Sequence, residues 1–310
     1  MTTKQHIGYI IGLTLLCFCF GTTRAQNEAN YSQYLFNIQK YNPAFVGNTE
    51  SPALTLLARQ QWVQFERPPQ TQTFSFQSPL KQQKMGLGFS LFNEQIGASK
   101  TQSAFIDYSF SVKLGTETRL RMGISGGVSN LIIDEGSFRL VEPNDPAFNP
   151  EAINIWQPNF GTGLFLSKPN LYLGLSAPKL LNNQAAIQTN TLALNQLILM
   201  SAIVFNLSRN IDLRPAICVQ YRPNEPVFSD IQLNFIFANQ WSIGAMFRTN
   251  ELMNFGINTN VLVGKNFRIG YAFDMFEYNG LSNISAGTHE LMLCIELNTK
   301  KNKYVSPLYF

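Results

Sequence analysis

The sequence predicts an all-β protein, a transmembrane, antiparallel, up-and-down β-barrel of about 14 strands that is preceded by a cleaved signal peptide. Three observations lead to this prediction. Long segments carry apolar side chains on one face only, the composition is rich in aromatic residues but poor in charge, and the connections between segments alternate between short and long.

The alternation is clearest in residues 101–114, TQSAFIDYSFSVKL. Every second residue from Ala104 to Leu114 is apolar, whereas the residues between them are mostly small, polar or charged. Because side chains alternate across a strand, such a segment has one apolar face. It is about twice as long as a usual soluble strand of ~5–6 residues, and its length suits a tilted crossing of an apolar band ~25 Å thick.

The composition favours strands over spanning helices. Hydrophobic residues make up 45% of the chain and aromatic residues 13%, but charged residues only 14%, against roughly 25% in an average soluble domain. The mean hydropathy is −0.05. No run of ~18 or more apolar residues occurs, which excludes a membrane-spanning helix.

Residues 1–25 have the features of a secretory signal peptide. Lys4 supplies the positive end, Ile7–Phe20 the apolar stretch, and the tripeptide TRA a small-x-small cleavage site before Gln26. A membrane anchor is the alternative, but the apolar run is too short for one.

Cleavage at this site leaves 21 basic and 19 acidic residues, a net charge of +2, which is too slight to indicate a nucleic-acid partner. It also leaves two of the four cysteines, Cys218 and Cys294, each inside a predicted strand. We interpret them as two buried free thiols, with a disulfide between them as the alternative, and not as a metal site.

Fourteen segments have one-sided patterns and are predicted to be strands. In chain order they are Ala53–Trp62, Gln70–Ser78, Lys84–Asn93, Thr101–Leu114, Thr118–Leu131, Trp156–Ser167, Asn170–Ala177, Leu192–Leu207, Ile211–Arg222, Val227–Ala238, Trp241–Arg248, Asn254–Val263, Phe267–Glu277 and His289–Leu297.

The connections carry a second signal. The even-numbered ones are the tight sequences PLKQQ, GTE, KP, SRN, NQ and GKN, whereas several odd-numbered ones, such as 132–155, 178–191 and 278–288, are long. Outer-membrane barrels have short periplasmic turns and longer outer loops. The pattern therefore predicts a barrel in the cell outer membrane with both chain termini in the periplasm.

The chain then divides into four parts: the signal peptide 1–25, an N-terminal segment 26–50, the barrel 51–298, and a C-terminal tail 299–310. Outer-membrane barrels often end on an aromatic residue of the last strand, whereas here a basic and aromatic tail follows that strand. We expect this tail to lie in the periplasm.

Residues 26–50 are too polar and too rich in Asn for a spanning strand. We expect them to form a periplasmic segment or to enter the barrel lumen, with a flexible leader as the alternative. The spacing of Tyr31, Tyr34, Phe36 and Tyr41 indicates that the segment packs against something.

Two predicted strands depart from the pattern. Pro215 lies inside Ile211–Arg222, where it cannot donate a ladder hydrogen bond. We expect either a bulge there or a strand that begins at Ala216. Leu192–Leu207 is apolar on both parities, so its lumen face is expected to contact a plug or a loop.

Aromatic residues near strand ends are typical of the girdles at membrane interfaces. The residues interpreted in this way are Trp62, Phe92, Trp156, Trp241, Phe267 and Phe276. With lipid on the apolar face, Ile106→Arg is expected to impair assembly, whereas Ser109→Arg on the lumen face is expected to be tolerated.

Catalytic, cofactor and metal sites are not predicted. His6 lies in the signal peptide, and a hydrolase in the barrel wall would have to use His289 with Glu290, which are more simply a polar pair at the end of a loop. The acidic residues of the connection 132–155, among them Asp134 and Glu135, are interpreted as solvated and not as a calcium site.

A passive outer-membrane porin or solute transporter is the main alternative function. Asp107, Lys113, Arg119 and Arg121 are all expected to face the lumen, where they would form a polar path for small solutes.

Several stretches, in order along the chain, point to a known family. They are YNPAFVGN (41–48), LLARQQWVQF (56–65), PPQTQTFSF (68–76), KMGLGFSLFNEQIG (84–97), LVEPNDPAF (140–148), PNFGTGLFL (158–166), GLSAPKLL (174–181), GTHELML (287–293) and SPLYF (306–310). The chain resembles the PorP/SprF family of outer-membrane proteins, which is associated with the type IX secretion system and gliding motility in Bacteroidetes.

The resemblance implies a non-catalytic barrel that supports the export or surface attachment of proteins with C-terminal sorting domains. It implies as partners the translocon, periplasmic ring or peptidoglycan-linking components, such secreted cargo, and outer-membrane lipid, but no nucleic acid. It brings no catalytic, cofactor-binding or metal-binding residues.

Overall fold

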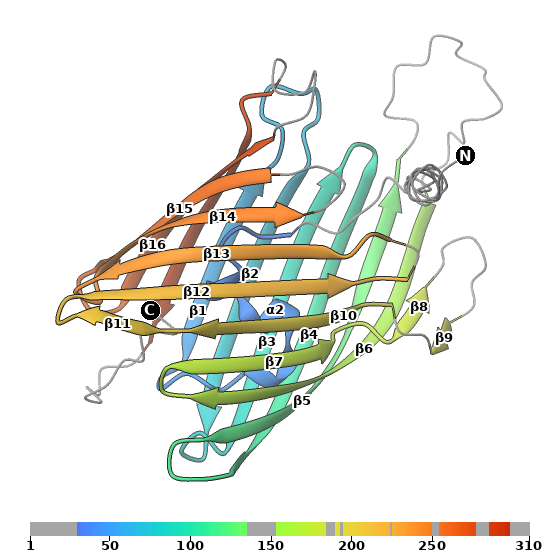
Figure 1. Ribbon diagram of the computed structural model, residues 1–310. Coiled ribbons are helices and arrows are strands. Elements are labelled where there is room, and N and C mark those ends of the chain that lie inside the picture. The colour runs from blue at the N-terminus through green and yellow to red at the C-terminus, as the bar shows by residue number, and fades with distance from the viewer. Residues whose placement is uncertain are drawn as a thin grey trace, which may run out of the picture.

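The structure, a computed structural model, describes residues 30–134, 153–183, 190–192, 195–223, 225–249, 254–276 and 285–297. In this part of the chain an antiparallel sheet closes into a 14-strand barrel (Figure 1). The predicted signal peptide 1–25, the tail 299–310 and most of the acidic connection 132–155 lie outside the described residues.

The wall is built from consecutive strands. They are β1 (Ala53–Gln60), β2 (Gln70–Leu80), β3 (Met85–Ile96), β4 (Ser99–Lys113), β5 (Arg119–Ile133), β6 (Ile153–Lys168), β7 (Leu171–Ala177), β10 (Leu197–Ile203) with β11 (Phe205–Ser208), β12 (Ile211–Tyr221), β13 (Phe228–Phe237), β14 (Trp241–Thr249), β15 (Asn254–Val263), β16 (Phe267–Phe276) and β17 (Thr288–Glu296). Each of the fourteen predicted segments corresponds to one wall strand.

Pairing between the first and last strands closes the wall. Ala53 of β1 lies opposite Glu296 of β17, and β10 pairs with both β7 and β12. Every strand therefore pairs with its neighbours in chain order, which is the predicted up-and-down topology. A closed wall also leaves no unpaired sheet edge in lipid.

The eighth wall strand differs from its predicted form. It divides into β10 and β11, and the first residue of the predicted segment, Leu192, belongs to a separate two-stranded hairpin of β8 (Leu181–Asn183) and β9 (Asn190–Leu192). The prediction merged these pieces because all of them are apolar and no Gly or Pro separates them.

Pro215 explains where the eighth strand divides. β12 runs unbroken through Pro215, which pairs with Leu233 of β13. On its other side, the interruption at Val204 separates β10 from β11, and the Val204 N–H donates to the Asn170 carbonyl (2.8 Å). The ladder therefore breaks in the neighbouring strand, next to the residue that lacks an N–H, so the expectation that β12 begins at Ala216 is wrong.

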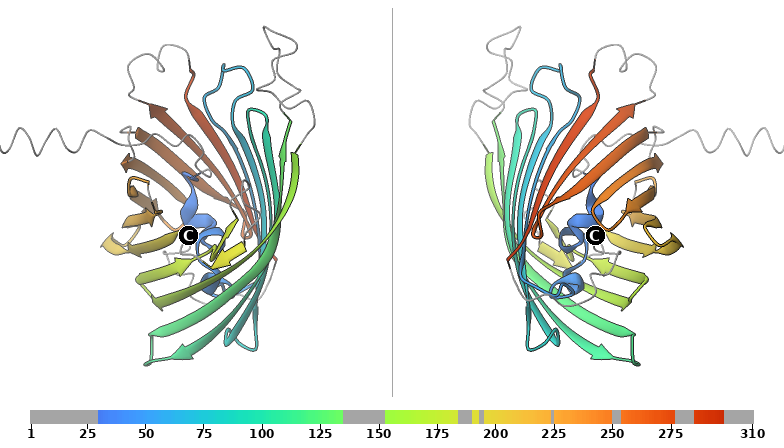
Figure 2. Two further views of the ribbon diagram at one scale, coloured as in Figure 1. Left: turned by 90° about the vertical axis from the view of Figure 1, so that its right-hand side faces the viewer. Right: turned by 90° about the vertical axis from the view of Figure 1, so that its left-hand side faces the viewer.

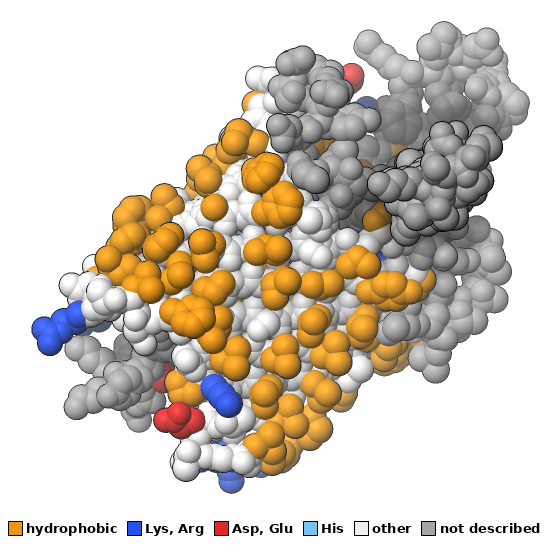
Figure 3. All heavy atoms as spheres, in the orientation of Figure 1, with side chains coloured by type: hydrophobic (Ala, Val, Ile, Leu, Met, Phe, Trp, Pro, Cys, Tyr) orange, Lys and Arg blue, Asp and Glu red, His pale blue; other side chains and the backbone are white. Residues whose placement is uncertain are grey.

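The outer face of the wall is apolar and meets lipid. Ile106 is 59% exposed, whereas the next residue, Asp107, is 3% exposed and faces the lumen. Apolar side chains cover the middle of the face formed by β10 and β12 to β16, and charged side chains lie at its margins (Figure 3). Among the described residues, no helix is long and apolar enough to cross a membrane.

The prediction of an aromatic girdle is confirmed in part. Trp156, Trp241 and Phe267 lie on the outer face and are well exposed. Phe92 was wrongly assigned to the girdle, because it has the parity of the lumen-facing residues of β3 and borders a cavity inside the barrel. The side chain of Phe276 lies outside the described part of the structure.

The two ends of the barrel differ. The end with the tight connections, which we call the short-turn end, holds the turns 81–84, 114–118 and 264–266 and also the first residue of β1 and the last of β17. The opposite, long-loop end holds the connection 61–69, the last residue of β5 and the last residue of β16.

Residues 30–48 lie inside the barrel, and we call them the plug. They form three short helical pieces: η1 (Tyr34–Phe36), α2 (Ile38–Tyr41) and η2 (Pro43–Phe45). Almost all of these residues are buried, and both side views place them within the curve of the wall (Figure 2). Of the two expected places for segment 26–50, the described part occupies the lumen.

Candidate functional site: the plug and the cavity beside it

The plug folds through local hydrogen bonds. The Asn42 side chain accepts from the Ala44 N–H (2.9 Å), and Pro43 begins η2, which is a usual arrangement at a helix start. The Tyr31 N–H donates to the Tyr41 hydroxyl (3.0 Å) and so ties the start of the plug to α2. Burial raises the pKa of the Tyr41 phenol well above its usual range, so the hydroxyl stays protonated.

One side of the plug packs against an apolar strip of the lumen wall. Tyr34, Ile38 and Phe45 of the plug share one buried cluster with residues of β6, β7, β10 and β12. Ile198 and Met200 of β10 are each 1% exposed in this cluster. The structure therefore confirms the expectation drawn from the two-sided apolar pattern of Leu192–Leu207.

The opposite side of the plug is held by carboxylates. The N–H groups of Ser32 and Gln33 donate to the two oxygens of Glu290 (2.9 and 2.7 Å). The Ser32 hydroxyl donates to Asp274 (2.8 Å), and the Ser32 carbonyl accepts from Gln232 (2.7 Å). One turn of plug backbone is thus fixed to β13, β16 and β17.

Two arginines complete this arrangement. Arg59 pairs with Asp274 (2.9 Å) and Glu290 (3.0 Å), and Arg248 pairs with Asp230 (2.6 Å) and Asp274 (2.8 Å). All five side chains are at most 5% exposed. We call Ser32 with these five residues the Ser32 clamp.

The clamp is electrostatically consistent. Its three carboxylates face two guanidinium groups and the backbone N–H groups of Ser32 and Gln33, so each negative charge has donors around it. Buried charges need such partners, because removing one partner leaves an uncompensated charge. The wall residues of the clamp lie in the strand halves next to the long-loop end.

A second clamp lies toward the short-turn end. Arg121, which is fully buried, donates to the carbonyls of Gly47 (2.6 Å) and Val46 (3.3 Å) and to the turn carbonyl of Gln83 (2.6 Å). The Ser109 hydroxyl also donates to the Val46 carbonyl. The plug is therefore fixed in both halves of the lumen.

Small wall residues let the plug approach. Three lumen-facing glycines on β3, β5 and β6 do this: Gly86, Gly123 and Gly163. A β-carbon on any of them would overlap Val46, Ala44 or Asn42 of the plug. The lumen faces of these strands therefore have glycine where a side chain would collide with the plug.

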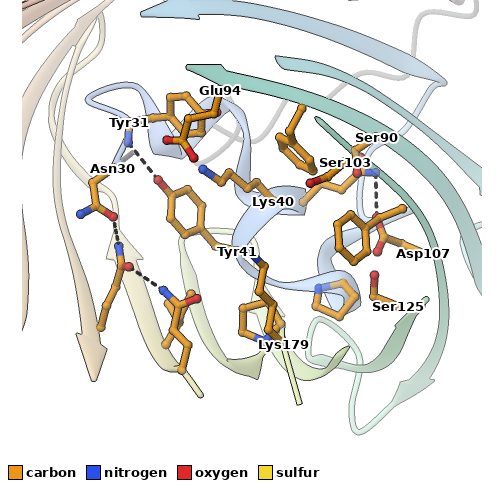
Figure 4. A pocket seen from close by; sticks show the side chains of 18 of the residues that line it. Asn30, Tyr31, Lys40, Tyr41, Ser90, Glu94, Ser103, Asp107, Ser125 and Lys179 are labelled. Carbon is orange, nitrogen blue, oxygen red and sulfur yellow. Dashed lines mark hydrogen bonds between the residues drawn. The ribbon is translucent and has the colours of Figure 1, made fainter. Parts of the chain in front are cut away.

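A cavity of about 80 Å³ lies between the plug and the long-loop end (Figure 4). Lys40 projects from the plug into it, with its ammonium 4.0 Å from the centre of the Tyr31 ring and 5.6 Å from that of Phe92. Gln39 at its floor donates to Asp107 (2.9 Å). Aromatic, hydroxyl, amide and charged groups thus face one space.

The comparisons with known proteins give one family. A family model described as type IX secretion system membrane protein PorP/SprF matches residues 23–295. The chain belongs to the PorP/SprF family. The comparison with curated proteins gives no match.

Solved structures show the same fold at low identity. The outer membrane protein Omp33 of Acinetobacter baumannii has a TM-score of 0.50 and 9% identity, and the match covers 81% of this chain and 100% of that one. CymD, a monoaromatic hydrocarbon channel, has a TM-score of 0.50 and 11% identity, with 86% and 91% covered. The family and the fold together make this PorP/SprF chain an outer-membrane protein.

Two of the four charged residues that were expected to line a pore contact the plug instead. Asp107 accepts from plug residue Gln39, and Arg121 holds the plug backbone. Arg119 donates to the Gln83 side chain (2.7 Å) near the short-turn end. Lys113 is exposed at the end of β4. These groups do not form a polar path through an open lumen in this PorP/SprF protein.

The remaining chemical candidates are also placed. His289 bonds to the Tyr271 hydroxyl (2.7 Å), whereas Glu290 points into the lumen clamp, so the two neighbours act on opposite faces of β17. Cys218 and Cys294 are free thiols, as predicted, but only Cys218 is buried, whereas Cys294 is partly exposed. Among the described residues, no group of three His, Cys, Asp or Glu side chains is placed to hold a metal ion.

The Ser32 clamp was not predicted. Its charges occur singly in five different strands, on the parity expected for a wet lumen. Nothing in the sequence pairs them with Ser32. The available signal was the number of charges near the long-loop ends of β1, β13, β14, β16 and β17.

Proposed function

We propose that this barrel is a non-catalytic outer-membrane component of the type IX secretion system and gliding machinery. In this role it supports the export or surface attachment of proteins with C-terminal sorting domains. Membership of the PorP/SprF family supports the link to secretion. Because the plug occupies the lumen, we favour a barrel that binds proteins and not one that passes solutes.

The observation that carries this proposal is the double attachment of the plug. The Ser32 clamp holds it in one half of the lumen, and Arg121 holds it in the other. A barrel whose lumen is filled by its own chain is suited to act through its two ends. Partners would then bind at the rims, and not along an open channel.

In the proposed orientation the short-turn end faces the periplasm. Periplasmic ring or peptidoglycan-linking components would contact the turns there, and the translocon and the cargo would contact the barrel from the membrane and the long-loop side. The cavity beside Lys40 adds aromatic, hydroxyl and charged groups that can hydrogen-bond and pack against a polypeptide segment.

The periplasmic position of both chain termini stays a prediction, and we propose it here for the C-terminus. The last residue of β17 lies at the short-turn end, which supports it. Residues 32 and 33 are held in the half of the lumen nearer the long-loop end. These contacts give the N-terminal half of the prediction no such support.

A passive porin or solute transporter is the alternative function. The cavity gives it some support, because it occupies the lumen on one side of the plug. Conductance separates the two functions, since a plugged barrel passes no steady current and a porin does.

Deletion of the gene in its native host tests the proposal. Surface and medium proteins would be quantified by mass spectrometry. Loss of one or a few large proteins with C-terminal sorting domains would indicate a barrel dedicated to particular cargo, and loss of all such proteins a core component. Unchanged export with reduced uptake of small solutes would contradict the proposal and favour the porin.

A further inference from the structure

The lipid-facing wall has a hollow across β1 to β5 that also borders β6. It is open to the outside and has a volume of about 500 Å³ between apolar side chains, among them Phe74, Leu91, Ala104, Val128 and Trp156. The side chains that pair in register across this part of the wall are large except on β4, where Ala104 stands between Leu91 and Val128. The small alanine side chain leaves the hollow open.

A row of neutral amides borders the hollow on its long-loop side. Gln72, Asn93 and Gln102 lie opposite one another in register on β2, β3 and β4. Gln102 donates to Asn93, and Asn93 donates to Gln72, each at 3.3 Å, on the exposed outer surface. Asn130 of β5 continues the row and pairs with Trp156.

The opposite wall has no such arrangement. Ala245 of β14 also faces outward, between Leu233 and Ile257, but the next row toward the long-loop end consists of the apolar residues Ile231, Phe247 and Phe255. The amide row is therefore a local feature of the wall with the hollow, and Ala245 provides a matched position without it.

We propose that the hollow binds one acyl chain of a membrane lipid whose uncharged headgroup bonds to the amide row. An unfilled gap in a lipid-facing surface forfeits dispersion contacts that a flexible chain can supply. No Lys, Arg, Asp or Glu lines the hollow, so its recognition depends on shape and on neutral hydrogen bonds. In the orientation proposed above, this lipid belongs to the outer leaflet.

Native mass spectrometry of the full barrel in detergent micelles tests this site. The probes are monogalactosyl diacylglycerol, which has an uncharged sugar headgroup, and dimyristoyl phosphatidylcholine, which has a zwitterionic one. We expect the wild-type barrel to retain one galactolipid in preference to phosphatidylcholine. Ala104→Trp fills the hollow and should lower that retention at least about fivefold, whereas Ala245→Trp should not change it.

The amides are tested separately. Gln72→Leu combined with Asn93→Leu and Gln102→Leu should remove the preference between the two probes. If Ala104→Trp does not fold, as judged by heat-dependent mobility on gels, Val128→Phe takes its place. Equal retention of galactolipid by the wild type and by Ala104→Trp would overturn the proposal, as would an equal loss of retention in Ala245→Trp. A dimer of the barrel that Ala104→Trp abolishes would also overturn it, because a second copy of the protein would then cover the hollow.

Discussion

Gly47 of the plug and Gly86 of β3 lie backbone against backbone. A β-carbon on Gly47 would come within 2.5 Å of the Gly86 α-carbon, and one on Gly86 would overlap the Val46 carbonyl. Gly47 also has a φ of +74°, in the left-handed region that favours glycine. The seat of the plug at the short-turn end therefore depends on both residues lacking a side chain.

Alanine at this contact should destabilise the plugged barrel. Gly264 is a matched control, because its φ is +71° and nothing lies within 4 Å of its missing β-carbon. Gly264→Ala carries only the backbone cost of about 1 kcal/mol. Gly47→Ala adds an overpacking cost of about 1–3 kcal/mol, which denaturant unfolding in micelles would measure. Equal losses of stability in the two variants would mean that the contact does not matter.

The Ser32 clamp should depend strongly on Arg59. Arg59→Met leaves the buried carboxylates of Asp274 and Glu290 with fewer donors, and breaking such buried pairs costs about 3–5 kcal/mol. Arg222→Met is the control, because its ion pair with Glu225 is longer (3.4 Å) and more exposed than those of Arg59, so its loss should cost less. Denaturant unfolding in micelles would measure both variants. If Arg59→Met lost no more stability than the control, the Ser32 clamp would not be important for stability.

The outer face of β4 and the lumen face of the neighbouring β5 should respond differently to a charge. Ile106→Arg places a guanidinium in lipid at a cost of about 2–4 kcal/mol near the bilayer midplane, so we expect impaired assembly. Ser125→Arg faces the cavity and Asp107 and should assemble. The fraction of heat-resistant folded barrel in isolated outer membranes would show this, and equal assembly of the two variants would argue against a lipid-facing Ile106.

Ser109 shows how far the sequence alone reaches. Its parity correctly predicts a lumen face, but tolerance of Ser109→Arg does not follow, because the side chain is fully buried and bonds to the Val46 carbonyl of the plug. Alternation along a strand encodes which face a residue occupies. It carries no information about what fills the lumen, because small and polar residues suit water and a packed plug equally.

The same limit explains the other differences. The fourteen strands follow from alternation and turn lengths, which are local. The Ser32 clamp joins residues up to 258 positions apart, and its charges have no local partners in the sequence. Phe92 has the parity of the lumen, and a position near a strand end alone does not distinguish a girdle residue from a lumen residue. Where Leu192–Leu207 was apolar on both faces, the pattern did predict contact with a plug or loop.

The orientation is tested by cysteine labelling of intact cells. Glu66 lies in a connection at the long-loop end and Glu117 in a turn at the short-turn end, and both are exposed. A membrane-impermeant maleimide should label Glu66→Cys in intact cells but Glu117→Cys only after the outer membrane is opened. The wild type gives the background from Cys218 and Cys294. The reverse order of labelling would mean that the barrel has the opposite orientation in the membrane.

The most direct measurement is the current through single barrels in planar lipid bilayers, with and without the plug. We expect no steady current from the wild type, because residues 30–48 fill the lumen. Deletion of residues 30–46 should give stepwise, lasting openings in barrels that still show heat-dependent mobility on gels. Steady open pores in the wild type, or a folded deletion variant that conducts no better than the wild type, would contradict a lumen closed by its own plug.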